Sequence, residues 1–260
     1  WLFVGPSGVG KTALARHIAT QLFGKEDALV RFDMSEFSEG HSVAKLLGSP
    51  AGYVGYREQN KLGDAIRKRP HAVLLFDEFE KAHPDVQHLL LQILEDGTLQ
   101  DASGKAISFR QTYIILTSNA GSDLLKRSAV GFKDGVPATH RSSLVQEHLR
   151  ERFRPELLNR LDRVVVFQPL EADALRRIID RELRELFERL KEQRGTISKS
   201  TKALVDWLLT KANAHKEEGA RAVRRVIERE IEQALVQAIL KSPKKKTFTL
   251  NVVKNLLTVK

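Results

Sequence analysis

The sequence predicts an α/β fold with a parallel sheet flanked by helices, followed by a smaller, mostly helical domain. Up to residue 167, short continuous apolar runs alternate with helical stretches, a pattern typical of parallel strands covered on both faces. After Pro169 the pattern changes to amphipathic helices. We therefore expect a large α/β domain over residues 1–168 and a small helical domain over 169–260.

The strands of the predicted sheet are the apolar runs. They are Trp1–Val4, Val30–Met34, Ala72–Phe76, Tyr113–Leu116 and Val164–Phe167. Leucines and isoleucines at helical spacing predict one helix that ends at Gly24 and another that ends at Gly97, since glycine is favoured just past a helix C-terminus. Two short segments within Thr98–Phe109 flank Ser103-Gly104 and predict a hairpin.

Three helices and one strand are expected in the small domain. The helices cover Leu175–Leu190, Ala203–Leu209 and Arg221–Leu240, and the strand covers Thr247–Val252. Apolar residues recur every three or four positions along the first of these helices, which predicts one face packed on a core.

Composition excludes several classes of protein. The chain has 260 residues and no cysteine, so it has neither a disulfide framework nor a thiolate zinc site. Its longest apolar run, Ala72–Phe76, is far shorter than the roughly 18 residues of a membrane span. No secretory signal and no H-E-x-x-H motif are present. We expect a soluble, cytoplasmic protein, and the start inside a predicted strand suggests a fragment of a longer chain.

Positive charge is concentrated in the second part of the chain. Residues 1–140 carry 16 basic and 16 acidic side chains, so the whole net charge of +10 lies in residues 141–260. A basic surface attracts nucleic acid or acidic polypeptide. The alternative is a set of solvated helix faces with a lysine-rich turn at Lys244–Lys246.

Eight consecutive residues fit the phosphate-binding pattern G-x-x-x-x-G-K-[ST]. They are Gly5, Pro6, Ser7, Gly8, Val9, Gly10, Lys11 and Thr12, and they stand between a predicted strand and a predicted helix. Glycines let backbone N–H groups curl around phosphate oxygens at a helix N-terminus. Lys11 would then contact the β- and γ-phosphates and Thr12 would bind Mg²⁺. The alternative is a glycine-rich turn without a ligand.

Polar residues also follow two other predicted strands. Asp77 and Glu78 close the third strand, and Asn119 follows the fourth. Phosphoryl transfer needs neutralised charge and an oriented nucleophile. Asp77 suits the first task by holding Mg²⁺ through water, and Glu78 suits the second by polarising the attacking water. Asn119 would orient that water or contact the γ-phosphate. The alternatives are a pair of helix-capping acids and a turn-forming asparagine.

At this point the sequence resembles the AAA+ ATPases, and more narrowly the second ATPase module of the two-ring Clp protein unfoldases. The segments that carry the resemblance are MSEFSEGHSV (Met34–Val43), GSPAGYVGY (Gly48–Tyr56), LLFDEFEKAHPDV (Leu74–Val86), LQILEDGTLQDASGK (Leu91–Lys105), FRPELLNRLD (Phe153–Asp162) and GARAVRR (Gly219–Arg225). The resemblance implies ATP and Mg²⁺ as cofactors, a homo-hexameric ring, and ATP bound where the large and small domains meet.

The resemblance assigns two arginines by matched position. Arg160 corresponds to the finger that reaches the γ-phosphate of the neighbouring subunit, which would make hydrolysis depend on assembly. Arg221 corresponds to the sensor that contacts nucleotide from the small domain. Without the resemblance, each would be an ordinary surface arginine.

Two loops carry the remaining functional expectations. Gly52, Tyr53, Val54 and Gly55 match an axial pore loop, in which Tyr53 would grip polypeptide; the alternative is a buried tyrosine in a turn. Val130, Gly131 and Phe132 match a tripeptide that docks on a barrel-shaped peptidase; the alternative is a small apolar patch.

We therefore expect an ATP-driven ring motor that unfolds and translocates polypeptide, feeding a peptidase through the Val130–Phe132 loop. The first alternative is a Clp-type disaggregase chaperone without a peptidase. A more remote alternative is an AAA+ ATPase that remodels nucleic acid, although no DNA-binding motif follows the ATPase core. The third is a nucleotide-binding scaffold that does not hydrolyse.

Overall fold

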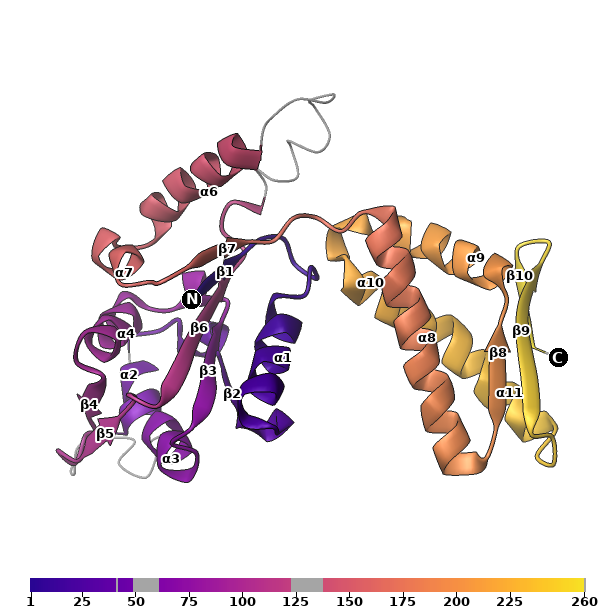
Figure 1. Ribbon diagram of the computed structural model, residues 1–260, viewed down its shortest axis with the longest axis horizontal. Coiled ribbons are helices and arrows are strands. Elements are labelled where there is room, and N and C mark those ends of the chain that lie inside the picture. Colours follow the sequence, from indigo (N-terminus) through magenta and orange to yellow (C-terminus); the bar gives the residue numbers. More distant parts are fainter. Residues whose placement is uncertain (41, 49–60, 123–137, 260) are drawn as a thin grey trace. The chain divides into compact units, whose positions relative to one another are not determined.

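The computed structural model describes residues 1–40, 42–48, 61–122 and 138–259 (Figure 1). The chain forms two compact units. The first contains Trp1–Pro6 and Gly10–Gln168, and the second contains Ser7–Val9 and Pro169–Lys260. No helix in this described part of the chain is long and apolar enough to cross a membrane.

A five-stranded parallel sheet forms the centre of the first unit. Its strands are β1 (Leu2–Val4), β2 (Leu29–Asp33), β3 (Ala72–Asp77), β6 (Thr112–Ser118) and β7 (Val164–Val166), in the spatial order β2-β3-β6-β1-β7. All five predicted strands are confirmed. Because the strands are parallel, their carboxyl ends lie at one edge of the sheet, here called the carboxyl edge, and their amino ends at the opposite, amino edge.

The two faces of this sheet are covered by different helices (Figure 1). Phe3, Val73, Leu75 and Ile115 pack with alanines of α1 (Lys11–Phe23) on one face. Alternate residues of the same strands pack on the other face with the remaining helices. Those helices are α2 (Ser42–Leu47), α3 (Lys61–Lys68), α4 (Pro84–Asp96), α6 (Ala138–Arg152) and α7 (Pro155–Asn159). Burial on both faces explains the continuous apolar runs, each large side chain contributing roughly 1.5–3 kcal/mol.

Turn residues end the elements where the sequence predicts. Gly24 and Gly97 both adopt left-handed backbone conformations after α1 and α4, and each donates its N–H to a carbonyl four residues earlier. The predicted hairpin consists of β4 (Thr98–Gln100) and β5 (Ala106–Ser108), which pair antiparallel. In its turn, Oδ1 of Asp101 accepts hydrogen bonds from the Ser103 hydroxyl and from the backbone N–H groups of Ser103 and Lys105.

The second unit combines helices with a small sheet. Its elements are α8 (Ala172–Arg194), β8 (Ile197–Ser200), α9 (Lys202–Asn213), α10 (Ala220–Val226), a π-helical segment η5 (Ile227–Glu232), α11 (Gln233–Lys241), β9 (Thr247–Val253) and β10 (Leu256–Val259). Strand β9 lies between β8, to which it is parallel, and β10, to which it is antiparallel. The three helices and the strand β9 were predicted, but β8 and β10 were not. The third predicted helix is not regular, because its middle turns are π-helical.

The core of this unit explains which predictions succeeded. Leu175, Ile179, Leu183 and Leu186 of α8 are buried, as the helical spacing of apolar residues predicts. Strand β8 has the sequence ISKS, whose single apolar residue gives no strand pattern. Lys254 and Asn255 both have positive φ in the two-residue turn between β9 and β10. Positive φ at both central positions is typical of a type I′ hairpin.

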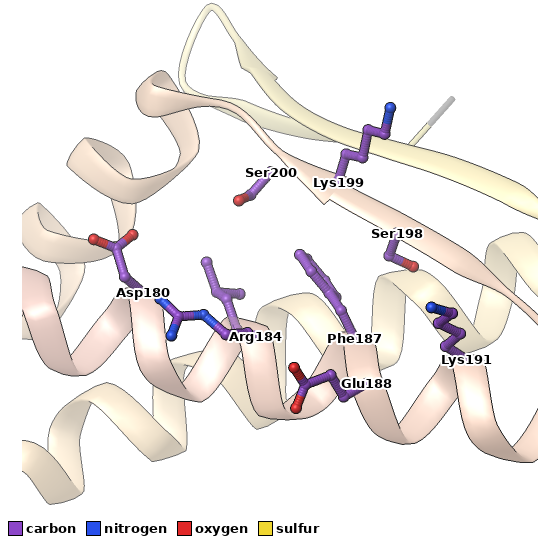
Figure 2. Close-up of a pocket in the computed structure, with 9 residues that line it drawn as sticks. Asp180, Arg184, Phe187, Glu188, Lys191, Ser198, Lys199 and Ser200 are labelled. Atoms are coloured by element: carbon purple, nitrogen blue, oxygen red, sulfur yellow. The ribbon is translucent and has the colours of Figure 1, made fainter.

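A hollow of about 570 Å³ lies between α8 and β8 (Figure 2). Figure 2 shows Phe187 directed from α8 towards β8, with Glu188 next to it and Arg184 and Asp180 farther along the same helix. Its lining contains side chains of both charge signs and none of the predicted site residues. This hollow is therefore not the predicted nucleotide site.

Candidate active site

Three neighbouring strands bring the predicted site residues of the first unit together. Strand β6 lies between β1 and β3, and the carboxyl ends of all three carry polar residues. The predicted phosphate-binding loop follows β1, Asp77 ends β3 and Glu78 comes directly after it, and Asn119 follows β6. Residues that are distant in the sequence thus share the carboxyl edge of the sheet.

The backbone of the loop requires glycine at its first position. Gly5 has φ of +152°, and a Cβ placed there would lie 2.5 Å from the carbonyl oxygen of Phe167. At the other end, Gly10 is the N-cap of α1 with φ of 102° and offers no side-chain cap. The first N–H groups of α1 therefore face the loop without a side-chain acceptor at that cap, which favours an anion.

Lys11 is held inside the loop. Its side chain is buried, with only 8% of the residue exposed, and Nζ donates to Gly5 O (2.6 Å), Pro6 O (2.8 Å) and Asn119 Oδ1 (2.9 Å). A buried ammonium has three donors to satisfy, and these bonds use them. Because the three acceptors are neutral oxygens, they orient the ammonium without themselves neutralising its charge.

Asp77 is buried, with 5% of the residue exposed, and it is surrounded by donors. Thr12 Oγ1 lies 3.2 Å from its Oδ2, and the Thr117 hydroxyl donates to Oδ1. Arg31 of β2 places Nη2 2.7 Å from Oδ2. The hydroxyl of Thr12 and the carboxylate of Asp77 are hard oxygen ligands of the kind Mg²⁺ prefers, so the two residues fit that ion.

Glu78 has an unusual backbone. It adopts a left-handed conformation (φ 55°, ψ 47°), which costs a residue other than glycine roughly 1–3 kcal/mol. Its N–H donates to the Thr117 hydroxyl at 3.0 Å, which holds this conformation in place. Its carboxylate lies 2.5 Å from Lys81 Nζ, and this hydrogen bond raises the pKa of Lys81 above its ordinary value. Strained backbone at such a position is typical of functional sites.

Arg160 lies at the opposite edge of the sheet. It follows α7, and its half-exposed guanidinium pairs with Glu95 of α4 at 3.1 Å. It lines an open hollow of about 860 Å³ together with Trp1, His71 and Thr112, which stand at the amino ends of β1, β3 and β6. Within one chain, the sheet therefore separates Arg160 from the phosphate-binding loop.

Arg221 lies in the first turn of α10, in the second unit. Its Nη1 donates to the hydroxyl of Ser7 at 2.7 Å, and Ser7 belongs to the same unit. One of the eight loop residues is thus in contact with the arginine that the resemblance assigns to nucleotide.

Sequence reasoning missed Arg31, Glu80 and Thr117. Arg31 interrupts an apolar strand with a charge, which is a readable signal. Glu80 accepts a hydrogen bond from the backbone N–H of Asn119, and nothing in the local pattern indicates this. The expectations for Gly52, Tyr53, Val54, Gly55, Val130, Gly131 and Phe132 lie outside the described residues.

Comparison with known proteins agrees with this geometry. Residues 1–164 match the AAA domain (Cdc48 subfamily), and residues 170–252 match the C-terminal D2-small domain of ClpB protein. The ATP-dependent Clp protease ATP-binding subunit ClpA homolog of Cyanidium caldarium is 46% identical over 92% of this chain and 29% of its own length. Chaperone protein ClpB of Rhodopirellula baltica is 44% identical over 93% of this chain and 27% of its own length. The chain thus spans less than a third of these relatives.

Solved structures give the same result. The S. cerevisiae Hsp104:casein complex in its extended conformation matches 99% of this chain and 45% of that chain, with a TM-score of 0.87 and 40% identity. A closed state of Hsp104 with ATPyS and FITC casein matches with a TM-score of 0.86. Since the family match covers the sheet and its loop, and the ClpB-type match covers the second unit, the chain belongs to the Clp family of AAA+ ATPases.

Proposed function

We propose that this chain is an ATPase module that hydrolyses ATP with Mg²⁺ and uses the free energy to translocate polypeptide. The observation that carries the proposal is the group of side chains at the carboxyl edge of the sheet. A buried lysine inside a glycine loop, a Thr12–Asp77 oxygen pair, Glu78 and Asn119 all meet there. Phosphoryl transfer depends on this kind of positioning and charge stabilisation.

Each residue has a role in this proposal. The N–H groups of the loop and the Lys11 ammonium bind the β- and γ-phosphates. To do so, Lys11 gives up its hydrogen bonds to the carbonyl oxygens of Gly5 and Pro6 and donates to phosphate oxygens instead. Thr12 and Asp77 would hold Mg²⁺, and the ion would supply positive charge that stabilises the phosphates. Glu78 breaks its ion pair with Lys81 and then polarises the attacking water. Asn119 orients that water or contacts the γ-phosphate.

The two arginines complete the site from different places. Arg160 cannot reach the loop of its own chain across the sheet, so we propose that it serves the site of the next subunit in a homo-hexameric ring. Arg221 contacts the nucleotide from the second unit, as its hydrogen bond to Ser7 supports. Differential contacts with ATP and ADP at these arginines would couple hydrolysis to motion.

The proposed substrate is unfolded polypeptide, gripped by Tyr53 in the channel of the ring, in the cytoplasm. The matched Hsp104 structures include casein, which supports this class of substrate over nucleic acid. Docking of a peptidase by Val130, Gly131 and Phe132 is the first candidate role, and a disaggregase role without a peptidase is the second. The relatives include both a protease ATP-binding subunit and a ClpB chaperone, so they favour neither.

Glu78→Gln in the protein that contains this chain tests the proposal. We expect ATP turnover to fall about 10²–10⁴-fold with ATP binding retained, because the amide cannot accept a proton from water. Glu156→Gln, an exposed change at the start of α7, should leave turnover intact. Casein should stimulate the unaltered protein and duplex DNA should not. Full turnover by Glu78→Gln would contradict the assignment.

A further inference from the structure

Glu80 is a carboxylate that the proposed mechanism does not use, yet it contacts the site. It lies in the 3₁₀ turn η3 (Phe79–Lys81) directly after β3. The turn is fixed to the core by Phe79, which is fully buried and stacks on Phe153 with ring centroids 5.9 Å apart. The backbone of Glu80 is therefore held rigidly, and its side chain is aimed from a fixed point.

The side chain of Glu80 joins two strand ends. Its Oε1 accepts the backbone N–H of Asn119 at 3.1 Å. Strand β6 ends at Ser118, whose carbonyl still accepts from Gly5 N, so Asn119 is the first residue beyond the ladder. The N–H of Asn119 therefore donates to a carboxylate instead of a carbonyl of a neighbouring strand. Hydrogen bonds to charged acceptors are stronger than those between neutral groups.

The contact leads directly to the phosphate-binding lysine. The amide oxygen of Asn119 accepts from Lys11 Nζ at 2.9 Å, while its backbone is held by Glu80. When the backbone of Asn119 is fixed, its side chain can move only by rotation about its own χ torsions. Glu80, Asn119 and Lys11 thus form a continuous series of contacts from β3 to the loop.

The other carboxylate oxygen of Glu80 indicates that this contact is not retained for stability alone. Oε2 is buried and has no hydrogen-bond partner within the described residues. An unpaired buried carboxylate oxygen destabilises the fold, and a neutral side chain would avoid that cost. Such uncompensated polar atoms call for an explanation in function or strain.

We propose that Glu80 is a positioning residue for ATP hydrolysis, which fixes the backbone of Asn119 so that the Asn119 amide is directed at the γ-phosphate and the attacking water. The inference rests on the proposed ATPase function. It assigns Glu80 no contact with nucleotide, so its effect passes through Asn119.

Two variants of the full-length protein test this role. Glu80→Ala removes the acceptor, and we expect kcat to fall about 10–30-fold while KM for ATP changes less than about 3-fold, because the loop is untouched. Glu80→Gln keeps a neutral acceptor in the same place and should stay within about 3-fold of the original kcat. Asp85→Ala, an exposed carboxylate at the start of α4, is the matched control and should leave both parameters unchanged.

A double-mutant cycle separates positioning from a general structural effect. In an Asn119→Ala background, Glu80→Ala should slow turnover less than about 2-fold further, because the residue it positions is gone. Additive losses would overturn the inference, as would equal losses of kcat in Glu80→Ala and Glu80→Gln. A lowered affinity for a fluorescent ATP analogue in Glu80→Gln would also overturn it. If Glu78→Gln keeps full turnover, the ATPase proposal itself fails; if only Glu80→Ala is unaffected, this inference alone fails.

Discussion

The two edges of the parallel sheet differ in how their functional residues are held. At the carboxyl edge, Lys11 and Asp77 are buried and bonded to neighbouring strand ends. At the amino edge, the side chain of Arg160 is 54% exposed and pairs with Glu95, itself 42% exposed. Buried, saturated groups are positioned within one chain, whereas an exposed arginine is free to serve a partner. This contrast is what the proposed division of the site predicts, with the carboxyl edge completed by one chain and Arg160 supplied to a neighbour.

The largest expected effect is at the amino edge. Arg160→Ala should lower ATP turnover about 10³-fold or more with ATP binding nearly unchanged, because a finger arginine stabilises charge in the transition state. Steady-state turnover and binding of a fluorescent ATP analogue measure the two quantities. Arg163→Ala, an exposed arginine three residues along, is the matched control.

Mixed rings sharpen this prediction. Subunits with Arg160→Ala and subunits with Lys11→Ala should each be inactive alone. If the site is shared as proposed, a mixture contains interfaces with an intact loop facing an intact arginine. Partial recovery of turnover on mixing is therefore expected, and a complete absence of recovery would contradict catalysis between subunits.

Lys11→Ala should give the opposite pattern to Arg160→Ala. In the proposed site the Lys11 ammonium contacts two phosphates. Its loss should therefore weaken ATP binding about 10²-fold, since charged hydrogen bonds contribute roughly 1.5–3 kcal/mol each. Equilibrium titration with the ATP analogue measures this change. If ATP affinity were unchanged while kcat fell, the comparison between the two edges would be wrong.

A smaller effect is expected for stability at the carboxyl edge. Arg31→Ala leaves the buried Asp77 without its ion-pair partner, and we expect the free energy of unfolding to fall by roughly 1–3 kcal/mol. Urea denaturation measures the loss, and Arg31→Lys should restore part of it. Arg69→Ala breaks an exposed pair with Asp27 and should cost less than about 1 kcal/mol. Equal losses in both variants would argue against a buried, structurally coupled pair.

The smallest effect concerns the hairpin. The Ser103 hydroxyl, followed by backbone N–H groups and Arg67, holds the pKa of Asp101 below its ordinary value. Because the pKa of Asp101 is lower in the folded chain, its carboxylate stabilises the fold at every pH above its unfolded-state pKa of about 3.9. This stabilisation is lost as the pH falls through the folded-state pKa. Asp101→Asn should therefore be slightly less stable than the original chain at pH 7 and equally stable near pH 2. A difference that persisted at pH 2 would contradict the electrostatic origin.

The local sequence was sufficient to predict those features that depend only on neighbouring residues. Continuous apolar runs located all five strands, and the glycine pattern located the loop. The local sequence was insufficient to predict contacts between side chains that are distant in the sequence. The turn Phe79–Lys81 directs Glu80 towards β6, and the strand order places Arg31 beside Asp77. The middle of the third helix became π-helical although its apolar spacing looked regular.

Local sequence shows which chemical groups are available: a glycine loop with a lysine and a threonine, two acids after one predicted strand and an asparagine after another. The positions of these groups in space follow from the way the whole chain folds. The order β3-β6-β1 makes neighbours of residues that are distant in the sequence, such as Lys11 and Asn119, which are 108 positions apart and share a hydrogen bond. The same sheet puts Arg160 at its far edge. The reason is that backbone pairing between strands depends on the whole chain, whereas a turn or a helix end depends on a few adjacent residues.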